Sequence, residues 1–214
     1  MPVGDPLYPV NLRLAGKAVL VVGAGGVAAG KVRGLLDARA VVTVVAIDAA
    51  DEVVALAETG AVTLERRPYA AGEAATYRLV VAATSDTAVN QAVHDDAEAA
   101  GVWVNAADDP ARCEFTMPAR VRRGDLLLTI STGGRSPALA SWLRRQLSEQ
   151  IGPEYEALLD LLADERERLR AEGVGTEALN WQSAFTSGIL DLVRSGRLDD
   201  ARELLRACLS SSSG

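Results

Sequence analysis

The chain has 214 residues and a mass of 22.4 kDa, enough for one large domain or two small ones with a core that needs no disulfide or metal. Its 49% hydrophobic and 24% charged residues exclude both a disordered chain and a membrane-embedded one. A net charge of −7 with few aromatic residues argues against a nucleic-acid partner. The N-terminus has no secretory pattern and there are two cysteines, so the sequence predicts a cytoplasmic protein.

Short apolar runs alternate with amphipathic stretches through the first half of the chain. The runs at 17–22, 41–47 and 78–83 end at small or polar residues, as buried parallel strands do. Further strands are expected at 62–64 and 102–105, and helices from Val27, at 51–59 and at about 88–100. This alternation predicts right-handed crossovers and an α/β, Rossmann-like parallel sheet domain over residues 1–112.

The pattern changes after Pro110. Two strands are expected at 115–121 and 126–131, followed by a helix at 137–150 that Gly152 and Pro153 end. These elements form a predicted small α+β domain over residues 113–152. Residues 153–214 form a predicted C-terminal helical domain, with one apolar stripe made of Leu158, Leu159, Leu162 and Leu169.

A G-x-G-x-x-A fingerprint lies between the first strand and the first helix. Its glycines are Gly23 and Gly25, followed by Gly26 and Val27, and it ends at Ala28. Gly23 permits a tight turn, Gly25 lets a pyrophosphate approach the backbone, and Ala28 allows close helix–strand contact. The pattern predicts a dinucleotide site, and the alternative is a glycine turn that binds no ligand.

The end of the second strand decides which dinucleotide is bound. Asp48 stands close to the position where an acidic residue binds the ribose hydroxyls, and no basic residue follows it nearby in the sequence. Asp48, Asp51 and Glu52 would repel a 2′-phosphate, so NAD is favoured over NADP. The alternative role for Asp48 is to cap the next helix.

Two more loops are expected at the carboxyl edge of the sheet, where ligands of open α/β sheets bind. The loop containing Ala83 and Thr84 has small side chains that leave room for a cofactor, although such residues are equally common as loop filler. The loop after the fifth strand carries Asp108, the candidate general acid/base, and Asp109, whose position before Pro110 favours a turn residue.

The middle of this acidic chain is basic, because residues 113–152 hold six arginines against three acidic residues. Within it, Thr132-Gly133-Gly134-Arg135-Ser136 leads into a helix with Ser136 as the expected N-cap. This loop is a candidate second anion site, and solvated surface is the plainer interpretation. No metal site is predicted, and the sole histidine, His94, is expected at the surface.

Four motifs in order carry a family resemblance: VLVVGAGGVAAGKV, VVAATSDTAVNQAV, VNAADDPARCEFTMPA and LLLTISTGGRSPALASWLRRQL. Together they resemble the precorrin-2 dehydrogenase / sirohydrochlorin ferrochelatase family, the N-terminal module of sirohaem synthase, over residues 7–209. The resemblance implies NAD-dependent oxidation of precorrin-2, an anionic tetrapyrrole, to sirohydrochlorin. In bifunctional members it implies insertion of Fe²⁺ as well. It also implies a homodimer formed through the middle domain.

The resemblance also assigns residues. Asp108 matches the family's essential aspartate, and the cofactor positions correspond to Gly26, Val27, Ile47 and Asp48. Thr132 stands where some members have a phosphorylated serine, so that regulation is not assumed here. Two alternatives stay open: a dehydrogenase without chelatase activity, and an NAD-sensing regulatory module without catalysis.

Overall fold

The computed structural model describes residues 6–107, 109, 112–177 and 179–210, which fall into two compact units. The first unit runs to Met117 and includes Gly133–Arg135. The second consists of Pro118–Thr132 and the chain from Ser136 onward. The boundary lies a few residues beyond the predicted one at residue 112.

The first unit contains a five-stranded sheet with the strand order β3-β2-β1-β4-β5, in which every pairing is parallel. Val22 at the end of β1 is level with Val45 of β2 and Ala82 of β4, so the carboxyl ends of the strands share one edge. The predicted Rossmann-like parallel sheet is therefore confirmed. The strands are β1 Ala18–Val22, β2 Val41–Ala46, β3 Thr63–Arg66, β4 Leu79–Ala82 and β5 Trp103–Ala106.

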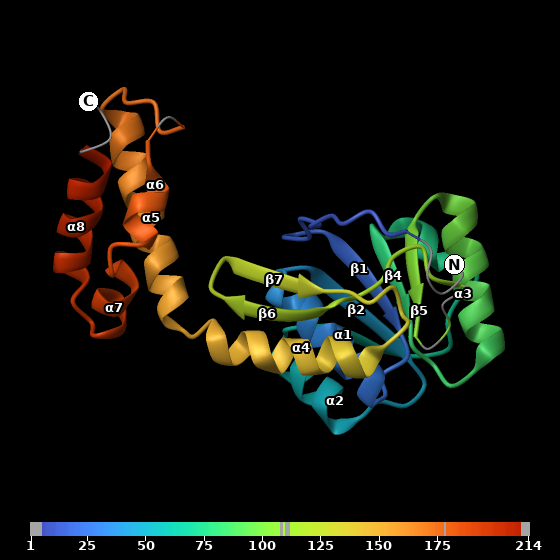
Figure 1. Cartoon of the computed structure of the whole chain (residues 1–214). Helices are drawn as coiled ribbons and strands as arrows, with labels where there is room; N and C mark the ends of the chain where they lie inside the picture. Colours follow the sequence, from blue (N-terminus) through green and yellow to red (C-terminus); the bar gives the residue numbers. More distant parts are fainter. Residues whose placement is uncertain (1–5, 108, 110–111, 178, 211–214) are drawn as a thin grey trace. The chain divides into compact units, whose positions relative to one another are not determined.

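Helices cover both faces of this sheet (Figure 1). Helices α1 (Gly26–Asp37) and α2 (Asp51–Glu58) pack on one face, and α3 (Thr87–Ala100) packs on the other. Because both faces are covered, β1 is apolar at every interior position instead of alternating. A short 3-10 helix, η1 (Glu73–Thr76), precedes β4 and is not predicted from the sequence.

The outer edge of β5 is covered by the chain that follows it. Asn105 and Cys113 form an antiparallel bridge. The backbone N–H of Glu114 donates to the carbonyl of Val104 at 2.9 Å, and the Glu114 carboxylate accepts the Val104 N–H at 3.1 Å. Both outward-facing backbone groups of Val104 therefore have partners.

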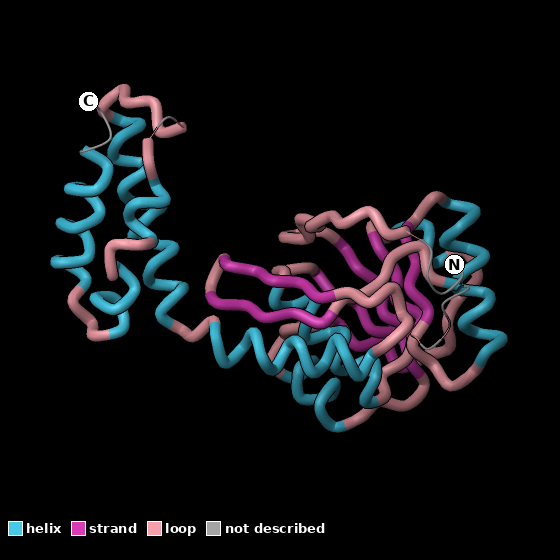
Figure 2. The backbone as a smooth tube through the Cα atoms, viewed as in Figure 1, coloured by secondary structure: helices cyan, strands magenta, loops and turns pink. Residues whose placement is uncertain are grey.

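The second unit begins with an antiparallel hairpin of β6 (Ala119–Arg123) and β7 (Leu126–Ile130), shown in magenta in Figure 2, followed by α4 (Pro137–Gln150). The predicted strand at 115–121 is wrong at its start. Phe115 packs instead against the apolar cluster of the first unit. Pro118 explains the difference, because proline lacks the N–H that a strand ladder requires.

The rest of the second unit is helical: α5 (Glu154–Ala171), α6 (Trp181–Phe185), α7 (Ile189–Arg194) and α8 (Leu198–Ser210). The buried stripe of α5 contains Leu161 and Glu165 in addition to Leu158 and Leu169, and the predicted Leu159 is not fully buried. Steps of three and four residues keep that stripe on one face, whereas Leu159 is rotated about 100° away from Leu158.

Glu165 is a carboxylate inside this helical core, with 3% of its surface exposed. The guanidinium of Arg168 donates to it from the same helix, at 2.6 and 3.1 Å, and Arg206 donates from α8 at 3.1 Å.

Among the described residues, no helix is both long and apolar enough to cross a bilayer. The separation into an α+β domain and a helical domain stays a prediction.

Candidate cofactor site

The glycine turn connects the end of β1 to α1. Gly23 has φ +102°, and its N–H donates to the carbonyl of Val45 at 2.8 Å. A Cβ at this position would lie 2.4 Å from the carbonyl oxygen of Ala83. Both the conformation and the close approach of two backbones therefore require glycine here. Ala28, at the end of the fingerprint, is fully buried where α1 packs on the sheet.

The other two glycines of the turn face open space. A Cβ added to Gly25 or Gly26 would meet no atom within 4 Å. Gly25 is the N-cap of α1, and the first N–H groups of a helix lack intrahelical partners. Val27, in the first turn, is more than half exposed. The turn is thus an open cradle of N–H groups at the positive end of a helix, which fits a pyrophosphate.

The loop after β2 lies beside this cradle. The N–H of Ala50 donates to the carbonyl of Ala24 at 2.9 Å, which ties the two loops together. Ile47 is 67% exposed, an apolar surface suited to an adenine ring. The N-cap of α2 is Ala50, so Asp48 is not the cap residue. The Asp48 carboxylate is exposed and forms no hydrogen bond with any described residue.

The loop after β4 is held by a buried amide that sequence reasoning missed. The side-chain oxygen of Asn90 accepts from the Thr84 N–H at 3.2 Å and from its hydroxyl at 2.8 Å, and the Asn90 amide donates back to the Thr84 carbonyl at 3.0 Å. Ala83 is half-buried beside Gly23. Asn90 therefore holds Thr84 in place. The side chains that this loop offers to a ligand are small.

A basic residue lies near the end of β2, contrary to the expectation that none does. Parallel pairing places Arg66 of β3 level with Ala46 of β2. The guanidinium of the next residue, Arg67, donates to Glu65 at 2.8 Å and to Glu73 at 2.6 Å, which lowers the pKa of the Glu73 carboxyl. The sequence separates β3 from β2 by a helix, so proximity in the sequence did not reveal Arg66.

A second missed cation, Lys31 of α1, reaches β5. Its ammonium group donates to the side-chain oxygen of the buried Asn105 at 3.2 Å. The Asn105 amide donates to the Phe115 carbonyl at 2.8 Å and to the thiol sulfur of Cys113 at 3.3 Å. Burial raises the pKa of that thiol. This network fixes the two chain segments that flank the loop after β5.

The candidate acid/base, Asp108, lies outside the described residues. Its neighbour Asp109 forms an ion pair with Arg112, whose Nε donates to the side chain of Gln91 at 2.6 Å. The Cys113 thiol donates to the Ala106 carbonyl at 3.1 Å and to the Asp109 carbonyl at 3.2 Å. Asp109 therefore has a local structural role, as expected for a turn residue.

The candidate anion loop is internally bonded. The hydroxyl of Thr132 donates to the Ser136 carbonyl at 3.1 Å and accepts the Ser136 N–H at 3.2 Å. The Ser136 hydroxyl accepts from the N–H of Leu139 at 3.2 Å, so Ser136 is the predicted N-cap of α4. Gly133 and Gly134 both have positive φ, and Arg135 is exposed.

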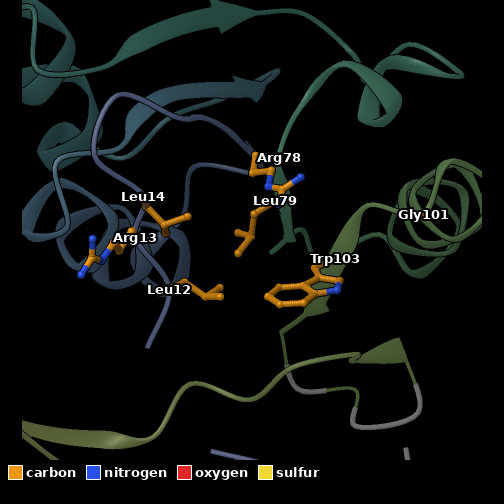
Figure 3. A pocket seen from close by; sticks show the side chains of 7 residues that line it. All are labelled: Leu12, Arg13, Leu14, Arg78, Leu79, Gly101 and Trp103. Carbon is orange, nitrogen blue, oxygen red and sulfur yellow. The ribbon is translucent and has the colours of Figure 1, made fainter. Parts of the chain in front are cut away.

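Two other features lie away from these loops. A cavity of about 300 Å³ opens at the opposite, amino-terminal ends of β4 and β5, between Leu12, Arg78 and Trp103 (Figure 3). His94 of α3 has most of its side chain covered, and ligand atoms of His94, Asp95 and Glu98 lie within 4.8 Å of one another. Neither feature contains a residue of the cofactor site.

Comparisons with known proteins agree with this geometry. Residues 10–119 match the family model of putative NAD(P)-binding domains, and residues 123–150 match that of the central part of sirohaem biosynthesis proteins. The sirohaem synthase of Methylococcus capsulatus is 38% identical over 92% of this chain and 42% of its own length. That of Pseudomonas putida strain F1 is 36% identical over 95% of this chain and 44% of its own length.

The chain spans about two fifths of the length of these curated relatives. A solved structure of SirC, precorrin-2 dehydrogenase, superposes with a TM-score of 0.72 at 29% identity and covers 94% of this chain and 98% of its own. The glycine turn, the parallel sheet and both family models point the same way, and the chain belongs to the precorrin-2 dehydrogenase / sirohydrochlorin ferrochelatase family.

Proposed function

We propose that the chain catalyses the NAD-dependent oxidation of precorrin-2 to sirohydrochlorin. The observation that carries this proposal is the open cradle at Gly25 and Gly26, in a chain that resembles a precorrin-2 dehydrogenase over nearly all of that protein's length. The nicotinamide ring supplies the hydride acceptor. The reaction converts precorrin-2 and NAD⁺ into sirohydrochlorin, NADH and one proton.

The chain's own task is to orient two large ligands and to remove that proton. We assign the proton to the carboxylate of Asp108, because it follows the end of β5 by two residues in the sequence and ligands of open α/β sheets bind at the carboxyl ends of the strands. The Lys31–Asn105 pair holds the start of that loop. Arg135 is an exposed guanidinium suited to the peripheral carboxylates of a tetrapyrrole, beside Thr132, Gly133, Gly134 and Ser136.

The test follows NADH absorbance when purified protein is mixed with precorrin-2 and NAD. Asp108→Ala should reduce NADH formation by at least about a hundredfold, because general acid–base catalysis typically contributes that much. NAD affinity should stay within about twofold. Asp160→Ala, at an exposed position of α5, is the matched control. Tight NAD binding by the wild type without NADH formation would instead favour the NAD-sensing module.

A second cuvette separates the bifunctional enzyme from a dehydrogenase alone. Sirohydrochlorin is mixed with Fe²⁺ and the protein, and formation of sirohaem is followed by its absorbance. The pyrrole nitrogens of the macrocycle are the final ligands of the metal, so chelation requires no resident metal in the protein. Metal insertion no faster than without protein would leave the dehydrogenase as the only activity.

The cytoplasmic location that the sequence indicates stays a prediction.

We also propose that two copies associate through the hairpin and α4. A two-stranded sheet is marginally stable alone, and β7 is only half-buried along its apolar side chains. None of the residues of α4, all of which the structure describes, is buried. Leu139 and Trp142 are 47% and 49% exposed. A second copy that covers these side chains would supply the missing apolar contacts.

A further inference from the structure

We propose that Arg66 forms a 2′-phosphate subsite at the adenosine end of the cofactor site, so that the chain binds NADP as well as NAD. This inference rests on the proposed function, because it places a dinucleotide across the glycine turn with its ribose at the end of β2. It revises the selectivity for NAD that the acidic residues after β2 suggest.

The position of Arg66 follows from the register of the sheet. Arg66 is the partner of Ala46, and the N–H of Arg67 donates to the Ala46 carbonyl at 3.1 Å. Partnered residues on neighbouring parallel strands project to the same face and lie about 4.8 Å apart. Ala46 precedes Ile47 and Asp48 by one and two residues. The last residue of β3 is therefore one strand spacing from the point where ribose is recognised.

The charge of Arg66 is available to a ligand. Its side chain is exposed and forms no ion pair or hydrogen bond within the part of the chain that the structure describes. Arg67 differs, because Glu65 and Glu73 already bind its guanidinium. A guanidinium binds phosphate oxygens through two parallel hydrogen bonds, which makes Arg66 a suitable partner for a phosphate on the 2′ oxygen.

The opposing acidic charge is smaller than the sequence suggests. Glu52 forms an ion pair with Arg33 of α1, which offsets part of its negative charge. Asp48 and Asp51 remain, and both are exposed, where water and salt screen repulsion between charges that do not touch. A direct contact between Arg66 and the 2′-phosphate is screened less by water and salt. We therefore expect the affinities for NADP and NAD to lie within about tenfold of each other.

Isothermal titration of the full chain with two adenosine probes tests the subsite. Adenosine 5′-monophosphate contacts the shared part of the site, and adenosine 2′,5′-bisphosphate adds only the 2′-phosphate. Arg66→Ala should weaken binding of the bisphosphate by about tenfold or more, the usual effect of losing a charge-assisted hydrogen bond. Binding of the monophosphate should change less than twofold.

Arg78→Ala is the matched control, because this arginine lines the cavity at the opposite edge of the sheet. It should leave the affinities for both probes unchanged. An equal loss of affinity for both probes in Arg66→Ala would overturn the subsite while leaving the cofactor site in place. A wild type that binds the monophosphate but not the bisphosphate would do the same. A wild type that binds neither probe would overturn the proposed function together with the subsite.

Discussion

The substitution Gly23→Ala should destabilise the first unit, because the added methyl group clashes with backbone atoms and alanine is strained at the φ of this residue. The added Cβ would lie 2.4 Å from the carbonyl oxygen and 2.7 Å from the carbonyl carbon of Ala83, and neither atom belongs to a side chain that can rotate away. Overpacking of this kind costs about 1–3 kcal/mol. The φ of +102° adds about 1–3 kcal/mol of backbone strain for alanine. We expect a loss of about 2–6 kcal/mol.

Gly25→Ala provides the contrast within the same turn. Its φ of −78° suits any residue and its Cβ meets no atom within 4 Å, so its free energy of unfolding should fall by less than about 1 kcal/mol. The methyl group would, however, occupy the space left for a pyrophosphate. Urea denaturation measures stability and titration with NAD measures affinity. A Gly23→Ala protein as stable as the wild type, or a Gly25→Ala protein with full NAD affinity, would refute the reasoning.

Three further predictions concern the second unit. Glu165→Ala should cost about 2–4 kcal/mol in denaturant unfolding at pH 7, because it removes the buried carboxylate that pairs with both Arg168 and Arg206 and leaves Arg168 only its exposed partner Glu172. The exposed Glu167→Ala should cost under about 0.5 kcal/mol. The Arg168 hydrogen bonds lower the pKa of Glu165, so its stabilisation is present above pH 4.5 and is lost as the pH falls below that value. A Glu165→Gln variant should lack this part of the acid-induced loss, and an identical pH profile would contradict the assignment. Trp142→Glu should shift micromolar protein from dimer to monomer in sedimentation velocity and Trp142→Phe should not, and a dimer that persists in Trp142→Glu would place the interface elsewhere.

Much of the architecture follows from local sequence signals. β-Branched runs that end at glycine or a small residue locate β1, β2 and β4 to within a residue or two. The helix α4 has its predicted bounds because a serine cap followed by proline begins it, and Gly152 and Pro153 follow its end. The fingerprint identifies the glycine turn because both the positive φ and the backbone contact at Gly23 have a local cause.

The residues that sequence reasoning missed act across the sheet. The pairing of β3 with β2 brings Arg66 level with Ala46 at the end of β2, and Lys31 of α1 donates to Asn105 of β5. A polar position on a helix looks solvent-exposed until its partner strand is known. Asn90 is likewise one polar residue among several on α3 until the loop folds back against it. Distance along the chain carries no information about such contacts.

The carboxylate of Glu114 has a consequence for how the protein behaves in concentrated solution. An outermost strand with unsatisfied backbone groups is a template on which another chain can add itself. Here Glu114 occupies both groups of Val104, one with its own N–H and one with its side chain, so no further strand can pair at that residue without displacing it. With its backbone and its side chain together, Glu114 thus helps to end the sheet at five strands and blocks the addition of another chain at Val104.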